Sequence, residues 1–179
     1  TDATYHAPDA ALDRIEGEGW TASHDIGGDR FREVSEGDSF DVGEFEVTVV
    51  GTHDPDAVHP VGYVIDHEAG TILHGGDTKP DESLLSTGRT FDVDLGVLAF
   101  GTAGMLPDGE GGRSRKRWYA DGNGVVEAAN QLRVDRLLPT HWDIWKGMTA
   151  DPTTLHHHAR SFPYPRRLEI VEVGGRIHI

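Results

Sequence analysis

The order of apolar and polar positions predicts strands through most of the first half of the chain. Apolar residues partly alternate with polar ones in the segments 31–34, 40–42 and 45–50, and alternation with period two is the signature of a half-buried strand. These three segments predict a meander. Two further segments, 61–65 and 71–73, predict a hairpin that turns at Glu68-Ala69-Gly70.

Helical periodicity, with apolar residues three or four positions apart, is clearest in the segment 124–132. A first helix is predicted over 8–16, because Pro8 suits the first helical turn and the glycines at positions 17 and 19 end it. Two more helices are expected, one beginning at Pro80 and one over 152–160.

The apolar run within 94–100 predicts a buried strand, and the helix at 124–132 leads into a further strand at 136–138. The segments 167–173 and 176–179 predict a terminal hairpin around Gly174-Gly175. A meander comes first, and strands that alternate with helices follow. The predicted fold class is therefore α/β in the broad sense, as either an α+β fold or a layered α/β fold. The apolar runs are only as long as a strand, which excludes a membrane-spanning helix of about 20 residues.

The charge balance limits the partners of the protein. The chain has 179 residues, with 31 acidic against 16 basic residues and a net charge of -15. Duplex nucleic acid requires a cationic surface that releases counterions, so a field of this sign disfavours nucleic acid and anionic membrane surfaces. The length fits one domain. We expect a small-molecule substrate as the partner. The charge does not exclude that copies of the chain form a homo-oligomer.

Composition also indicates the surroundings in which the protein works. Aspartate is abundant and only three basic residues are lysines, which is typical of a protein adapted to concentrated salt, where screening removes the repulsion between carboxylates. An ordinary acidic cytosolic protein is the alternative. The first residues lack both Met and the pattern of a signal peptide, and we expect a cytoplasmic protein. Without cysteine, a metal ion would need histidine and carboxylate ligands.

Histidine and aspartate follow three of the predicted strands. His53 follows the segment 45–50, Asp77 lies in the His-Gly-Gly-Asp-Thr sequence after 71–73, and His141 follows 136–138. Ligand sites in layered α/β proteins lie at the carboxyl ends of strands, so these groups predict a site. They suit a divalent ion that keeps an open position for water, and zinc lowers the pKa of such a water. Spacing alone leaves open that the histidines are loop residues and Asp77 a turn former.

Other polar clusters have simpler explanations. His156, His157 and His158 point in different directions on a predicted helix, which favours a solvated surface. His59 could approach the site, or it shapes its loop. The glycine-rich segment 101–120 predicts a long loop. Its basic cluster is either a solvated surface or a contact for an anionic substrate, and consists of Arg113, Arg115, Lys116 and Arg117.

Three motifs together resemble a known family. They are the segment 74–78, His53 followed by the segment 60–65, and Leu-Pro-Thr-His-Trp-Asp-Ile-Trp at 138–145. In order and spacing they resemble the later metal motifs of the metallo-β-lactamase-fold hydrolases, and among these the branch of bacterial ascorbate-6-phosphate lactonases and related metal-dependent hydrolases. The resemblance runs from about Pro8 to the C-terminus and implies an αββα sandwich.

The resemblance also implies roles for single residues. His53 would be a ligand of one metal ion, Asp77 the carboxylate that bridges two ions, and His141 the last ligand of the second ion. The implied metal is zinc, with manganese as the alternative. Residues expected to support these ligands from their loops are His59, His74, Thr78 and Asp143.

One motif of the family, H-x-H-x-D-H, should precede the first helix and is missing from this sequence. We therefore expect the chain to be the C-terminal portion of a longer protein and to lack the first sheet of the sandwich. The leading hypothesis is a dinuclear metal-dependent hydrolase that acts on an ester, a lactone or a phosphoester, with this chain alone inactive. The alternative is a non-catalytic binding or assembly module that keeps the fold without the first metal motif.

Overall fold

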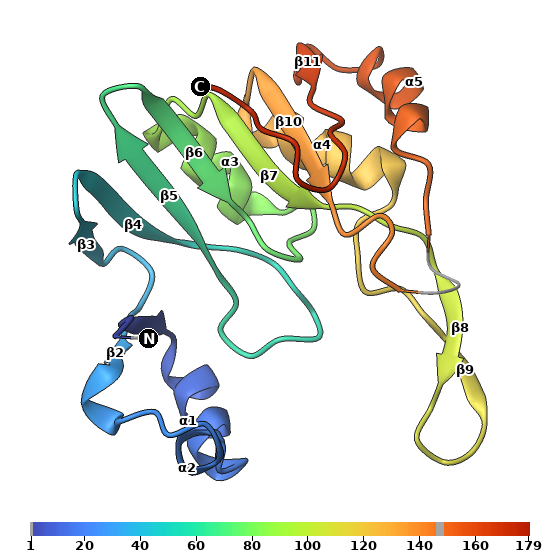
Figure 1. Ribbon diagram of the computed structural model, residues 1–179. Coiled ribbons are helices and arrows are strands. Elements are labelled where there is room, and N and C mark those ends of the chain that lie inside the picture. The colour runs from blue at the N-terminus through green and yellow to red at the C-terminus, as the bar shows by residue number, and fades with distance from the viewer. Residues whose placement is uncertain (1, 146–148) are drawn as a thin grey trace.

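The computed structural model describes residues 2–145 and 149–179, and a mixed sheet of seven strands is the largest element of this part of the chain (Figure 1). Its strand order is β11-β10-β7-β6-β5-β4-β3. Pairs from β3 to β6 are antiparallel, whereas β6, β7, β10 and β11 pair in parallel. The strands are β3 (Ser39–Val42), β4 (Phe45–Gly51), β5 (Val61–His67), β6 (Gly70–His74), β7 (Leu95–Ala99), β10 (Arg136–Thr140) and β11 (Arg167–Leu168).

The connections explain this change of direction, because antiparallel strands need only a short turn and parallel strands need a crossover. The crossover from β6 to β7 contains α3 (Glu82–Thr90), and the one from β7 to β10 contains α4 (Gly122–Leu132). Both helices begin at an aspartate whose carboxylate accepts a backbone N–H of the first turn. Asp81 accepts from Ser83 and Asp121 accepts from Gly124, which is the preferred N-cap chemistry.

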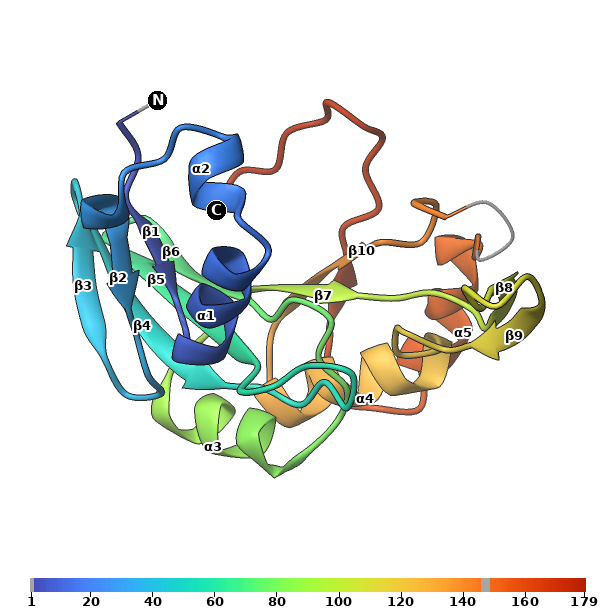
Figure 2. The ribbon, with the colours of Figure 1, turned by 90° about the horizontal axis from the view of Figure 1, so that it is seen from below.

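The main core lies between the sheet and the helices α3, α4 and α5 (Leu155–Ala159), which cover one face together with the short 3-10 helix at Pro152–Thr154 (Figure 2). Alternate strand residues point to this face. Fully buried side chains that meet there include Val64, Leu73, Leu84, Leu98, Val125, Leu132, Leu137 and Leu155.

The opposite face of the sheet is covered less completely. The C-terminal segment crosses it, since Arg136 Nη1 donates a hydrogen bond of 2.8 Å to the carbonyl oxygen of His178, and Figure 1 shows this segment in front of β10. Arg136 also pairs with the mostly buried Glu169 at 2.7 Å. Apolar residues that remain partly exposed on this face are Ile65, Ile72, Val97 and Leu138.

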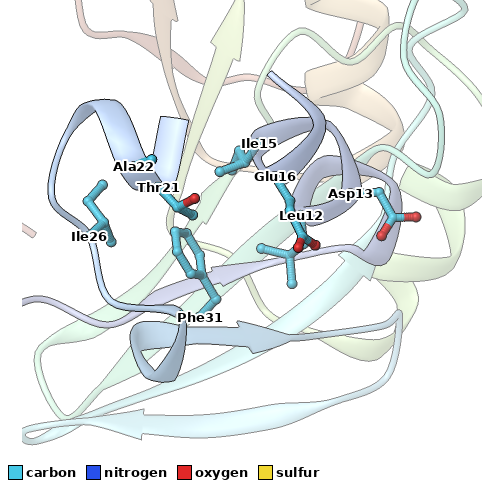
Figure 3. A pocket seen from close by; sticks show the side chains of 9 residues that line it. Leu12, Asp13, Ile15, Glu16, Thr21, Ala22, Ile26 and Phe31 are labelled. Carbon is cyan, nitrogen blue, oxygen red and sulfur yellow. The ribbon is translucent and has the colours of Figure 1, made fainter. Parts of the chain in front are cut away.

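The N-terminal segment forms a separate layer with its own two-stranded parallel sheet, β1 (Tyr5–Ala7) and β2 (Phe31–Glu33). Between these strands lie α1 (Asp9–Gly17), α2 (Trp20–Ser23) and a 3-10 turn at Gly28–Arg30. They surround an apolar cavity of about 480 Å³. Figure 3 shows Phe31 and Ile26 facing Ile15 and Leu12 across it.

Several sequence expectations are confirmed. The hairpin of β5 and β6, the buried strand β7 and the helices α1 and α4 occur where the sequence predicted them. The helix expected from Pro80 begins two residues later, at Glu82, because Asp81 caps it. No helix of the described residues combines the length and apolar character needed to cross a membrane.

Three expectations are wrong. The segment 31–34 does not join the meander, because β2 pairs with β1 instead of β3. The terminal hairpin does not form, although Gly175 donates to the Glu172 carbonyl in a turn, because β11 pairs with β10 and the rest of the segment is held across the sheet. The segment 101–120 contains a hairpin of β8 (Gly104–Pro107) and β9 (Arg113–Lys116), which projects from the domain in Figure 1.

Candidate metal site

The parallel part of the sheet brings Asp77 and His141 to the same edge. Asp77 follows β6, and His141 is the first residue after β10. The strand β7 lies between β6 and β10, and all three run in the same direction. Their carboxyl ends therefore meet, as expected for ligand sites in α/β sheets.

The two side chains lie in direct contact. Asp77 Oδ1 and His141 Nδ1 are 2.8 Å apart. Both atoms are shielded from solvent, and neither makes a hydrogen bond with another described residue. A buried polar atom without a partner carries a desolvation cost, and a metal ion is a partner that would satisfy both. Carboxylate oxygen and imidazole nitrogen are the donors that divalent zinc accepts in proteins, so this pair fits a metal ion.

The backbone of His141 is strained. Its φ is +64°, in the left-handed region that costs an L-residue with a side chain about 1–2 kcal/mol. Such strain persists only where the surroundings hold it, and it concentrates at functional sites.

His53 belongs to the neighbouring loop after β4, and that loop is fastened to the Asp77 loop. Its backbone N–H donates to the Thr78 hydroxyl at 3.1 Å, and the Lys79 N–H donates to the His53 carbonyl at 2.8 Å. An ion pair of 3.6 Å between Lys79 and Asp54 lies beside these contacts. The Ser83 hydroxyl, with a smaller contribution from His53, holds the pKa of Asp81 below its ordinary value.

The expected convergence of three ligands is therefore present in part. Asp77 and His141 touch, and His53 is tied to the Asp77 loop through the backbone. Across residues 2–145 and 149–179, no group of three His, Asp or Glu side chains has the geometry to hold a metal ion.

The expected supporting residues divide into two groups. Thr78 is buried, accepts from His53 and donates to the Lys79 carbonyl, so it joins the two loops. His59 instead pairs with Asp9 at 2.9 Å at the exposed start of α1. His74 is exposed and accepts from Gly76 within its own turn, and Asp143 is exposed. The structure thus gives only Thr78 a contact within the candidate site.

Sequence reasoning missed the aromatic surroundings of His141. The ring of Tyr119 meets the His141 imidazole edge-on, with centroids 5.1 Å apart, and the Trp145 indole N–H donates to the Tyr119 hydroxyl at 2.7 Å. Burial raises the pKa of Tyr119, the Trp145 bond opposes this, and the charge of Asp77 raises the pKa further. The adjacent Trp118-Tyr119 pair at the end of the glycine-rich segment was the available signal.

The sheet that carries this Asp–His pair has the fold of a known family. Residues 1–142 match the family of the beta-lactamase superfamily domain, and the chain belongs to this family. Among individual relatives, a UPF0173 metal-dependent hydrolase of Rubrobacter xylanophilus is 21% identical over 137 residues, with 74% of this chain and 51% of the relative covered. The chain thus spans about half the length of that relative.

Two solved structures share the fold. Igni18, a metallo hydrolase from Ignicoccus hospitalis, has a TM-score of 0.68 and 16% identity over 96% of this chain and 66% of its own. The metallo-beta-lactamase fold protein YhfI from Bacillus subtilis has a TM-score of 0.62 and 14% identity over 93% of this chain and 61% of its own. The α/β metallo-β-lactamase fold predicted from the sequence is confirmed.

Proposed function

We propose that this chain is part of a metal-dependent hydrolase in which Asp77 and His141 hold a divalent metal ion. The contact between Asp77 Oδ1 and His141 Nδ1 is the observation that supports the proposal, since both atoms are buried and have no hydrogen-bond partner among the residues that the structure describes. The names of the relatives, a metal-dependent hydrolase and a metallo hydrolase, agree with it. His53, from the loop fastened to that of Asp77, is the proposed further ligand.

The proposed ion is zinc, with manganese as the alternative, and two ions are proposed for the full-length protein, bridged by Asp77. A divalent ion in such a site lowers the pKa of a water molecule and polarises the bond to be cleaved. The chain's own contribution is to fix the donors: Thr78 joins the loops of His53 and Asp77, and Tyr119 packs against His141.

We propose an ester, a lactone or a phosphoester as the substrate. Because the motifs resemble those of the ascorbate-6-phosphate lactonase branch, the enzyme proposed in particular is lactonase-like, and we propose that it works in the cytoplasm. A homo-oligomer is compatible with this proposal. On this proposal the chain by itself would be inactive. The alternative is a non-catalytic module, and it is favoured by the fact that only two possible ligands touch within the described residues.

Metal binding by this chain is the first test. In titration calorimetry with zinc and manganese, the Asp77→Asn variant should bind at least about 10–100-fold more weakly than the unmodified chain, since even the loss of an outer-shell partner has that effect. Asp143→Asn is the matched control, because it makes the same change on an exposed residue two positions after His141. Equal affinity of Asp77→Asn and the unmodified chain would contradict the proposal.

Activity is the second test. In the full-length protein, Asp77→Asn should reduce hydrolysis of model esters, lactones and phosphoesters far more than it reduces the unfolding midpoint, because it removes a charge and preserves size. Metal bound without turnover of any of these substrates would favour the non-catalytic module.

A further inference from the structure

Tyr119 contacts the His141 imidazole, and Trp145 is in turn hydrogen-bonded to Tyr119. Trp145 is 47% exposed, yet its indole N–H donates to the hydroxyl of Tyr119, which is only 5% exposed. Two contacts hold the half-buried indole, the edge-on contact with Trp118 and the hydrogen bond to Tyr119. Of the two, the hydrogen bond is directional and sets which way the N–H points.

Tyr119 itself is fixed by the backbone at the end of β7. Ala120 forms a bridge with Phe100, and the Gly101 N–H donates to the Ala120 carbonyl at 3.0 Å. The Tyr119 ring lies so close to Gly101 that a Cβ there would be 2.7 Å from Cδ2. The Tyr119 ring is thus held in a fixed position, because the sheet holds its main chain and Gly101 lets the ring pack against the backbone.

The Tyr119 ring contacts a residue whose backbone is strained. His141 has the left-handed backbone described above, and its imidazole rests edge-on against the Tyr119 ring while Nδ1 faces Asp77. Trp145 lies four residues after His141 in the same loop. The hydrogen bond from Trp145 to Tyr119 therefore ties this loop to the phenol that contacts His141.

We propose that Tyr119 is a positioning residue for metal binding, which holds the His141 imidazole toward Asp77 and is itself locked by the Trp145 N–H. The inference rests on the proposed function, because it assigns Tyr119 a role toward the metal ion that Asp77 and His141 would hold. It predicts that the Tyr119 hydroxyl and the Trp145 N–H act as one unit.

The test uses Co²⁺ as a spectroscopic probe of this chain, with visible absorption reporting both affinity and ligand geometry. Tyr119→Phe keeps the ring and removes the hydroxyl, and Trp145→Phe keeps an aromatic ring and removes the donor. Each should weaken Co²⁺ binding by up to about tenfold, at the low end of the 10–100-fold effect of a partner bonded directly to a metal ligand, because the lost hydrogen bond acts on His141 only through the Tyr119 ring. Each should also change the absorption spectrum. The double variant should be no weaker than either single variant, since coupled residues are not additive.

Trp118→Phe is the matched control, because Trp118 contacts Trp145 edge-on at 5.8 Å and has no hydrogen bond in the described part of the chain. It should leave the affinity and the spectrum unchanged. Unfolding midpoints of all variants, measured without metal, separate loss of positioning from loss of folding.

Two outcomes would overturn the inference alone while the proposed function stands. One is full Co²⁺ affinity in Tyr119→Phe when Asp77→Asn has lost it. The other is additive losses in the double variant, which would indicate general packing. An unmodified chain that binds no Co²⁺ would overturn the inference together with the proposed function.

Discussion

Gly88→Ala tests how closely the two crossover helices approach each other. Gly88 is buried in α3, and a Cβ at this position would lie 2.6 Å from the carbonyl oxygen of Leu132 and 2.7 Å from that of Gln131, at the end of α4. Ordinary contact begins at 3.4 Å, so the closest contact is about 0.8 Å too short. Because the opposing atoms are backbone, the helices must move apart.

The expected net effect is a loss of stability. Overpacking of this kind costs about 1–3 kcal/mol, and replacing glycine by alanine within a helix returns up to about 1 kcal/mol. We expect the free energy of unfolding to fall by about 1–2 kcal/mol. With a urea dependence of about 1–3 kcal/mol per molar, the midpoint followed by circular dichroism should fall by about 0.3–2 M at unchanged slope.

Gly17→Ala provides the matched control. Gly17 is also helical, at the end of α1, and a Cβ there would meet no atom within 4 Å. The same substitution should leave stability unchanged or raise it by up to about 1 kcal/mol, since alanine restricts the unfolded chain. A Gly88→Ala midpoint equal to or above that of the unmodified chain would refute the close approach of α3 and α4.

Two further predictions concern charge. Asp81→Ala should lower the free energy of unfolding by about 1 kcal/mol at neutral pH, because it removes the cap of α3. The Ser83 hydroxyl chiefly holds the pKa of Asp81 below its ordinary value of 3.8, so the stability difference between the two proteins should be complete above that pH and vanish as the pH falls through the lower folded-state pKa. A pH-independent difference in unfolding midpoints would exclude a charged cap. The net charge of -15 should make the unfolding midpoint rise between dilute buffer and molar KCl, because the screening length shrinks from ~30 Å at 0.01 M to ~3 Å at 1 M; a flat or falling midpoint would remove the argument for salt adaptation.

Periodicity along the sequence was sufficient for elements that form from neighbouring residues. The hairpin of β5 and β6 and the helix α4 are local structures whose apolar spacing directly reflects which side is buried. The same holds for the placement of Asp77 and His141 at the ends of strands. Since strands that run in the same direction end at one edge, strand position predicted that His53, Asp77 and His141 would converge, and the 2.8 Å contact bears this out for Asp77 and His141.

Periodicity did not reveal which strands pair. The segment 31–34 has the same alternation whether it joins β3 or β1, and only the tertiary structure selects β1. The terminal segment has a turn at Gly175 and alternating residues, yet the edge of β10 and the bond between Arg136 and His178 determine its path. Pairing depends on contacts between residues distant in sequence, which a local pattern does not contain.

The surroundings of the candidate site also depended on the tertiary structure. Tyr119 and His141 are 22 positions apart in the sequence, and the bridge between Phe100 and Ala120 brings them together. His59 contacts Asp9, a residue 50 positions earlier, and not the candidate site. The sequence determined which residue types could bind a metal and on which strands they lie, whereas the tertiary structure decided which of them touch, because side-chain contacts form only after the sheet has fixed the distances between its loops.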